Sequence, residues 1–122
     1  MYLVNYIYLH LSITVMIFDD WKENKKNVTL SPALLWEYSL SDFDWDYMRT
    51  LVVGRVIERG RPDDFYAAIR LYGGLENFIE IIKEVPELTA IDMAFVCTYF
   101  DLKKEELRCY TRKQSRERLL NS

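Results

Sequence analysis

The chain has 122 residues, enough for one domain, and a globular domain of this size buries roughly two-thirds of the surface of its unfolded chain. Half of the residues are hydrophobic and 15% are aromatic, which excludes disorder over most of the chain, while four Gly and three Pro argue against a sandwich of many short strands. The net charge is −3, but residues 1–102 hold nine basic and sixteen acidic side chains, and residues 103–118 hold seven basic and three acidic ones. We predict an all-α bundle of about five helices in a cytoplasmic protein, with a basic C-terminal end that suggests an anionic partner.

Residues 1–28 are predicted to form an N-terminal extension, 29–110 the helical domain and 111–122 a basic tail. Residues 1–18 are apolar with four polar interruptions, and they lack the basic start and the cleavage site of a signal peptide. Their length barely reaches that of a membrane span, so we expect no anchoring; a strand-like segment, a docked helix and a true start at Met16 all stay open. Residues 19–30 are polar enough for a linker.

Ser31 followed by Pro32 is typical of a capped helix start and opens a predicted short helix, PALLWEYS. Its buried side should hold Leu34, Leu35 and Tyr38, with Trp36 at least partly covered.

Two amphipathic helices joined by a tight turn are predicted within residues 45–73. Asp44 is the expected cap of the first, Gly60 should end it in a left-handed conformation, and Pro62 should begin the second, which stops at Gly73 and Gly74. The expected core residues, at three- and four-residue spacing, are Met48, Leu51, Val52, Val56, Ile57, Phe65, Ala68, Ile69, Leu71 and Tyr72.

A third long helix is predicted over 75–85 and a fourth from Thr89, with Asp92 completing a weak capping box. Asp101 is expected to cap a short helix over 102–107. The apolar stripes of these helices are Leu75, Phe78, Ile79, Ile82 and Val85, and then Ile91, Phe95, Val96 and Tyr99.

The fourth helix, a turn at 100–101 and the helix after it have the outline of a helix-turn-helix. In that case Lys103 and Lys104 would begin a recognition helix, and Arg108, Arg112 and Lys113 would neutralise phosphates, with binding that weakens steeply with salt. The alternative is an ordinary corner between two helices of a bundle.

A second basic cluster, Arg55, Arg59 and Arg61, surrounds the end of the first central helix. It could hold an anion, or it could complement the helix C-terminus and pair with nearby acids. Asp63 and Asp64 suit a helix N-terminus better than a metal. The lone His10 and the two cysteines, Cys97 and Cys109, build no catalytic or metal constellation, so we expect reduced thiols, no cofactor, no metal and no enzymatic activity.

The segments LSPALLWEY, DFDWDYMRTLVVGRVIERG, DDFYAAIRLYG and FDLKKEELRCYTRKQ together resemble an uncharacterised family of small bacterial proteins, over about residues 29–114. The resemblance implies a domain of unknown function, suspected to be an antitoxin-like partner of nucleotidyltransferase-type toxins. The motif positions in this chain are Ser31, Pro32, Trp36, Glu58, Arg59, Gly60, Arg108, Cys109, Tyr110, Arg112, Lys113 and Gln114.

Three functional hypotheses follow. The leading one is an antitoxin-like interaction module that binds the product of a neighbouring gene and perhaps operator DNA. The second is a protein-only adaptor that docks an acidic partner through the basic C-terminus. The third is an enzyme acting on phosphorylated ligands through Arg55, Arg59 and Asp63.

Overall fold

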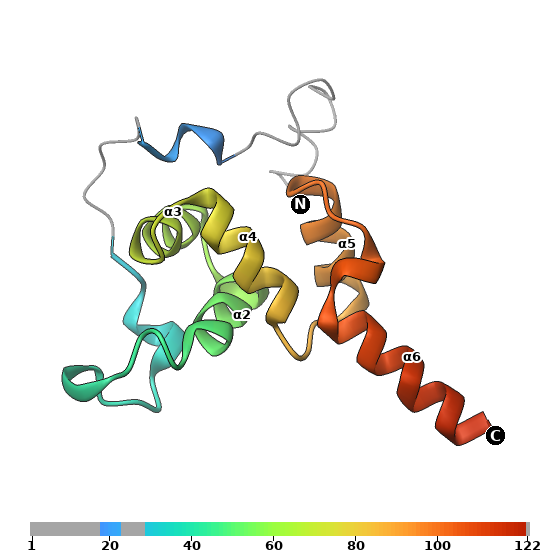
Figure 1. The fold of residues 1–122 in the computed structure, drawn as a ribbon. Coiled ribbons are helices and arrows are strands. Elements are labelled where there is room, and N and C mark those ends of the chain that lie inside the picture. The colour runs from blue at the N-terminus through green and yellow to red at the C-terminus, as the bar shows by residue number, and fades with distance from the viewer. Residues whose placement is uncertain (1–17, 23–28, 122) are drawn as a thin grey trace.

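The structure, a computed structural model, describes residues 18–22 and 29–121, and the regular structure in these residues is helical with no strand (Figure 1). The described residues form five α-helices: α2 (Arg49–Arg59), α3 (Pro62–Leu71), α4 (Leu75–Glu84), α5 (Ala90–Tyr99) and α6 (Arg108–Asn121). Single 3-10 turns precede or separate them: η2 (Asp19–Lys22), η3 (Pro32–Leu35), η4 (Leu40–Asp42) and η5 (Lys104–Glu106). The predicted all-α fold of about five helices is confirmed.

The core lies between α2, α3 and α4, which pack on one another, while α5 packs on α2 and α6 packs on α4 (Figure 1). The apolar stripe predicted for α4 is confirmed at its centre, because Phe78 and Ile82 are fully buried. The largest fully buried side chains are Phe78, Ile69, Ile82, Leu107, Val52, Val53, Val56 and Val96. They come from α2 to α5 and from the residue before α6, so all the long helices except α6 supply the centre of the core.

The segment of residues 18–22 also contributes to the core, through Phe18. Phe18 is 2% exposed, stacks on Phe65 with ring centroids 4.9 Å apart and lies 5.9 Å from Phe100. The hydroxyl of Tyr66 donates to Asp20 at 2.6 Å. Residues 18–22 therefore pack against α3 and the end of α5.

The joint between α2 and α3 corrects one prediction. Gly60 is extended (φ −74°, ψ 154°) and not left-handed, and its amide donates to the Val56 carbonyl at 2.7 Å. A Cβ at Gly60 would lie 2.5 Å from that same carbonyl oxygen. Glycine is needed here because the chain passes so close to the last turn of α2. Pro62 begins α3 as predicted.

The predicted stop after α3 is confirmed. Gly73 and Gly74 have φ values of +90° and +128°, a region that side chains with a Cβ rarely adopt. The Gly74 amide donates to the Ile69 carbonyl at 2.8 Å, which closes the end of the helix.

Helix starts were predicted less well. The Asp44 carboxylate does accept from the Tyr47 amide at 3.0 Å, but it caps a separate turn, and α2 begins only at Arg49. Thr89 is confirmed, since its hydroxyl accepts from the Asp92 amide at 3.1 Å. Asp101 is not a cap: it takes a left-handed φ of +54°.

The short helix predicted after Ser31 is only the four-residue η3, and Ser31 does not cap it. The Ser31 amide and hydroxyl donate instead to the buried Asp64 carboxylate at 2.8 and 2.9 Å. Leu34 and Leu35 are buried as predicted, whereas Trp36 is 76% exposed and Tyr38 is 37% exposed. The segment is too short to bring a second turn of side chains to the core.

The prediction that Leu71 and Ile91 are buried was also wrong, because Leu71 is 45% exposed and Ile91 is 73% exposed. Each lies at the edge of its helix's stripe, beyond the surface that the neighbouring helices cover.

The predictions for residues 1–17 and 23–28, including the membrane span, the start at Met16, His10 and most of the linker, lie outside the described residues. Among residues 18–22 and 29–121, no helix combines the length and the apolar character needed to cross a bilayer.

Candidate functional site

Among the α-helices of the described residues, α6 is the most exposed. Its 14 residues extend over about 21 Å, and the helix leaves the body of the domain at the C-terminal end of the chain (Figure 1). Cys109 is its one buried residue, and Tyr110 and Gln114 are half-buried, with the Gln114 amide donating to the Tyr110 hydroxyl at 2.9 Å. The fully buried Leu107 anchors the start of the helix. The segment predicted as a basic tail is therefore mostly helical.

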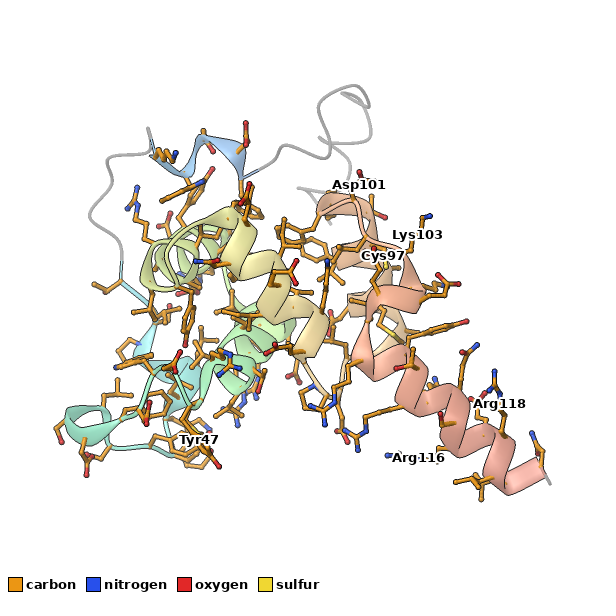
Figure 2. All side chains as sticks on the ribbon, viewed as in Figure 1. Tyr47, Cys97, Asp101, Lys103, Arg116 and Arg118 are labelled. Carbon is orange, nitrogen blue, oxygen red and sulfur yellow. The ribbon has the colours of Figure 1, made fainter. Side chains whose placement is uncertain are left out.

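Three arginines, Arg108, Arg112 and Arg116, lie four residues apart on α6, so they share one side of the helix. We call them the α6 arginine stripe. All three are exposed, and Ser115 lies beside them. Arg118 leaves the opposite side of α6 from Arg116, as Figure 2 shows.

The cations of α6 are not neutralised by the rest of the described chain. Among residues 18–22 and 29–121, no carboxylate lies within ion-pair distance of Arg108, Arg112, Lys113, Arg116 or Arg118. Arg112 makes one contact outside its helix, a hydrogen bond from its guanidinium to the Pro86 carbonyl at 3.3 Å. The stripe therefore presents cationic groups that an anionic molecule can reach.

The five residues predicted as one site do not gather on one face. Arg108 and Arg112 belong to the stripe, while Lys104 and Lys113 line a separate hollow of about 260 Å³ together with Glu117. Lys103 lies beside the start of η5, where its amide donates to the Glu106 carboxylate at 2.8 Å, and it is far from Arg116 along the chain and in Figure 2. Arg116, which the prediction omitted, completes the stripe; its four-residue spacing from Arg112 was visible once the segment is taken as a helix.

The connection between α5 and α6 differs from the predicted one. It runs over residues 100–107 and contains η5, so it is longer than the three- or four-residue turn of a helix-turn-helix. The second helix begins at Arg108 rather than 102, and Lys103 and Lys104 precede it. The prediction of a recognition helix that starts with these lysines was wrong.

The second basic cluster is divided in a similar way. The Arg55 guanidinium pairs with the Glu37 carboxylate at 2.7 Å, donates to the Leu34 carbonyl at 2.8 Å and is only 19% exposed. Arg55 therefore ties α2 to the η3 segment, and it is not available to an anion. Arg59 and Arg61 are exposed at the joint. Arg55 was one of the three residues of the enzymatic hypothesis, and this ion pair occupies it within the fold.

Asp64 has a structural position that the sequence did not indicate. It is 2% exposed and accepts hydrogen bonds from the Ser31 amide, the Ser31 hydroxyl and the Arg61 amide, all within 3 Å. These donors satisfy a buried carboxylate without a metal ion. Within the described part of the chain, no three or more His, Cys, Asp or Glu side chains are grouped so that they could hold a metal.

The two thiols are not activated. Burial raises the pKa of Cys97 and of Cys109 above the ordinary value of a thiol. Because the thiolate is the reactive form, both cysteines are less reactive at neutral pH than an exposed cysteine.

The sequence analysis missed an apolar groove of about 460 Å³ between α5 and the joint of α2 and α3. Ile91, Ala94, Phe95 and Thr98 form one wall. The signal was present in the segment AIDMAFVCTY, which is apolar on every side, whereas one buried stripe needs apolar residues on only one side.

Residues 30–82, less than half of the chain, match DUF6922, a family of unknown function. The match runs from just before η3 into α4, and therefore covers the Asp64 carboxylate but neither the groove wall on α5 nor α6. No curated protein and no solved structure matches the chain.

Proposed function

We propose that this chain is an antitoxin-like interaction module, acting in the cytoplasm, whose α6 arginine stripe contacts the phosphates of DNA. The observation that carries the proposal is the stripe itself: Arg108, Arg112 and Arg116 are exposed on one side of a helix that leaves the body of the domain. The packed core of α2, α3 and α4 is the scaffold that positions it.

Arginines at four-residue spacing suit a phosphate backbone for two reasons. Consecutive stripe residues are about 6 Å apart along the helix axis, and each strand of B-DNA carries a charge about every 3.4 Å of its axis, so each arginine can contact a different phosphate. The guanidinium group donates two hydrogen bonds at once to one phosphate, and the Ser115 hydroxyl beside the stripe is a further donor. A helix also fits the major groove of B-DNA.

The test compares two matched charge reversals. Arg112→Glu with Arg116→Glu changes the stripe, and Arg59→Glu with Arg61→Glu makes the same change of net charge at two exposed arginines on the α2–α3 joint. Fluorescence anisotropy with the DNA upstream of the gene, at several salt concentrations, should show binding that is much weaker in the first variant and retained in the second.

The slope of log K against log salt should also fall by about two when two phosphate contacts are removed. An equal loss in both variants would mean that only net charge matters and would contradict the assignment to α6.

A second candidate function, a protein-only adaptor, is favoured by a different observation. Residues 1–102 carry sixteen acidic and nine basic side chains, so the body of the domain repels DNA while α6 attracts it. Leu120 at the end of α6 is 79% exposed, and an apolar side chain there suits a protein surface better than a phosphate backbone. Co-purification with the product of the neighbouring gene, without DNA affinity, would select this function.

A further inference from the structure

One helix of the domain is apolar on every side but covered on only one. In α5, Met93, Val96 and Tyr99 are buried against the core. On the other side Ile91 is 73% exposed, and Ala94 and Thr98 are also exposed. A helix that is apolar all round normally has partners on all sides. The uncovered side of α5 therefore indicates a surface that another molecule covers.

This side of α5 forms one wall of the apolar groove. The opposite wall consists of Ile57, Gly60, Pro62 and Phe65, at the joint of α2 and α3. Phe95 lies within the groove and packs against Tyr99 and Phe65, with ring centroids 4.6 and 5.9 Å apart. The wall residues from Ile91 to Thr98 extend over about 10 Å, or two turns of a helix.

The groove has an acidic edge at the start of α5. A second hollow, of about 290 Å³, adjoins it and is lined by Glu58, Glu87 and Asp92, and Asp92 lines both. In the described part of the chain, these three carboxylates make no ion pair. Arg59 and Arg61 flank the joint but line neither hollow.

We infer that the groove binds a helix of a partner protein, one whose apolar face ends in lysine or arginine. An apolar groove whose α5 wall is two turns long fits the i, i+3, i+4, i+7 side chains of an amphipathic helix. The free carboxylates at one end select a cation at the matching end of that helix. No residue of α6 lines the groove or its acidic edge, and the inference does not depend on the function proposed for α6.

The probe is a pair of designed helical peptides with the same leucine positions, one carrying lysines and the other carrying glutamates. Each is labelled with a fluorophore and titrated with the full chain. The lysine peptide should bind and the glutamate peptide should not, because its charges repel the acidic edge.

Because an acidic body attracts any basic peptide, the decisive variant leaves the charge unchanged. Ile91→Asn with Ala94→Gln makes the wall polar and should weaken binding of the lysine peptide about tenfold, the effect of losing apolar anchors. Leu40→Asn with Leu71→Asn, at two exposed leucines away from the groove, should leave binding within about twofold. Circular dichroism verifies that both variants are folded.

A third variant, Glu58→Gln with Glu87→Gln, should weaken binding and reduce its dependence on salt. Three results would overturn the inference: equal weakening by the groove and control variants, equal binding of the two peptides, or self-association of the chain that the groove variant abolishes. The last result would identify a second copy of the chain as the occupant.

Discussion

The helices α4 and α6 have opposite relations to the rest of the molecule. In α4, ten residues long, Phe78 and Ile82 are fully buried, and polar side chains occupy the solvent side. In α6, fourteen residues long, only Cys109 is buried. The longer helix thus contributes less to the core. Since an isolated helix of this length is marginal in water, α6 depends on its anchored first turns, whereas the side chains of its remaining turns are mostly exposed.

The largest expected effect of a single substitution lies in α4. Phe78→Ala removes a fully buried ring that contacts Phe65 and Phe100, and it should lower the free energy of unfolding by about 4 kcal/mol. Urea denaturation followed by circular dichroism measures the change. A loss below about 1 kcal/mol would show that the core is not centred on α4.

The next effect concerns the attachment of the η3 segment to α3. Asp64→Ala leaves the Ser31 and Arg61 amides without their acceptor in a buried site, and it should cost about 3 kcal/mol. The neighbouring Asp63 is exposed, so Asp63→Ala is the control and should cost less than about 1 kcal/mol. The same urea experiment compares the two variants. Equal losses of unfolding free energy would show that Asp64 does not stabilise the attachment of the η3 segment to α3.

Replacing Gly54, inside α2, and Gly60, just after α2, by alanine should change the stability of the protein in opposite directions. Gly60→Ala places a Cβ 2.5 Å from the Val56 carbonyl oxygen and should destabilise the protein by about 2 kcal/mol. Gly54→Ala, inside α2, meets only Val85 Cγ1 at 3.4 Å and should stabilise it by about 0.5 kcal/mol, because alanine is the better helix former. Thermal unfolding measures both; a stabilising Gly60→Ala would contradict the geometry of the joint.

The burial of Tyr72 predicts how the stability of the protein depends on pH at alkaline pH. Burial, with a smaller contribution from Asp46, raises the pKa of Tyr72 to about 12. Below pH 10 its stabilising contribution is complete, and it is lost as the pH rises through the folded-state value, because the unfolded chain releases the proton first. Tyr72→Phe should reduce this alkaline loss and, since the hydroxyl donates to the Trp45 carbonyl at 2.8 Å, cost about 1 kcal/mol at neutral pH.

The measurement is urea unfolding at several pH values, and Tyr47→Phe is the matched control because Tyr47 is 79% exposed. If both variants unfold alike above pH 10, the alkaline loss arises elsewhere.

The smallest effect is expected in α6. Leu120→Ala, at a side chain 79% exposed, should change the free energy of unfolding by less than about 0.5 kcal/mol. A loss comparable with that of Phe78→Ala would mean that α6 packs against something in solution, and the contrast between the two helices would fail.

Much of the fold follows from local signals in the sequence. Pro62, the glycines after α3 and the Thr89 cap mark helix ends by their own local chemistry, so they were predicted correctly. Ser31 and Asp101 carry equally good local signals, but a tertiary contact overrides the first and a left-handed backbone the second. Periodicity identified the buried sides of the helices. Which residues at the edges of an apolar stripe stay exposed depends on how the neighbouring helices pack.

The candidate site was predicted only in part. The basic segment was visible in the charge distribution, but the stripe requires the knowledge that 108–121 is helical, and its high charge hid that helix because it has no apolar stripe. For Arg55 an anion site and pairing with a nearby acid were both left open, and the acid that pairs with it, Glu37, was not foreseen because it lies on a segment whose fold the sequence did not indicate. The groove lies between α5 and the joint of α2 and α3, which are distant in sequence, so no local pattern could delimit it.

The burial of Phe18 in the core limits how far the chain can be truncated. A fragment cut to residues 30–82, where the family match begins and ends, would discard the Phe18 ring, all of α5 and Leu107, each of which fills part of the same interior. The remaining three-helix piece would expose Phe65 and Phe78 to water and should aggregate on expression. The smallest unit worth cloning therefore starts before Phe18 and reaches at least Tyr110.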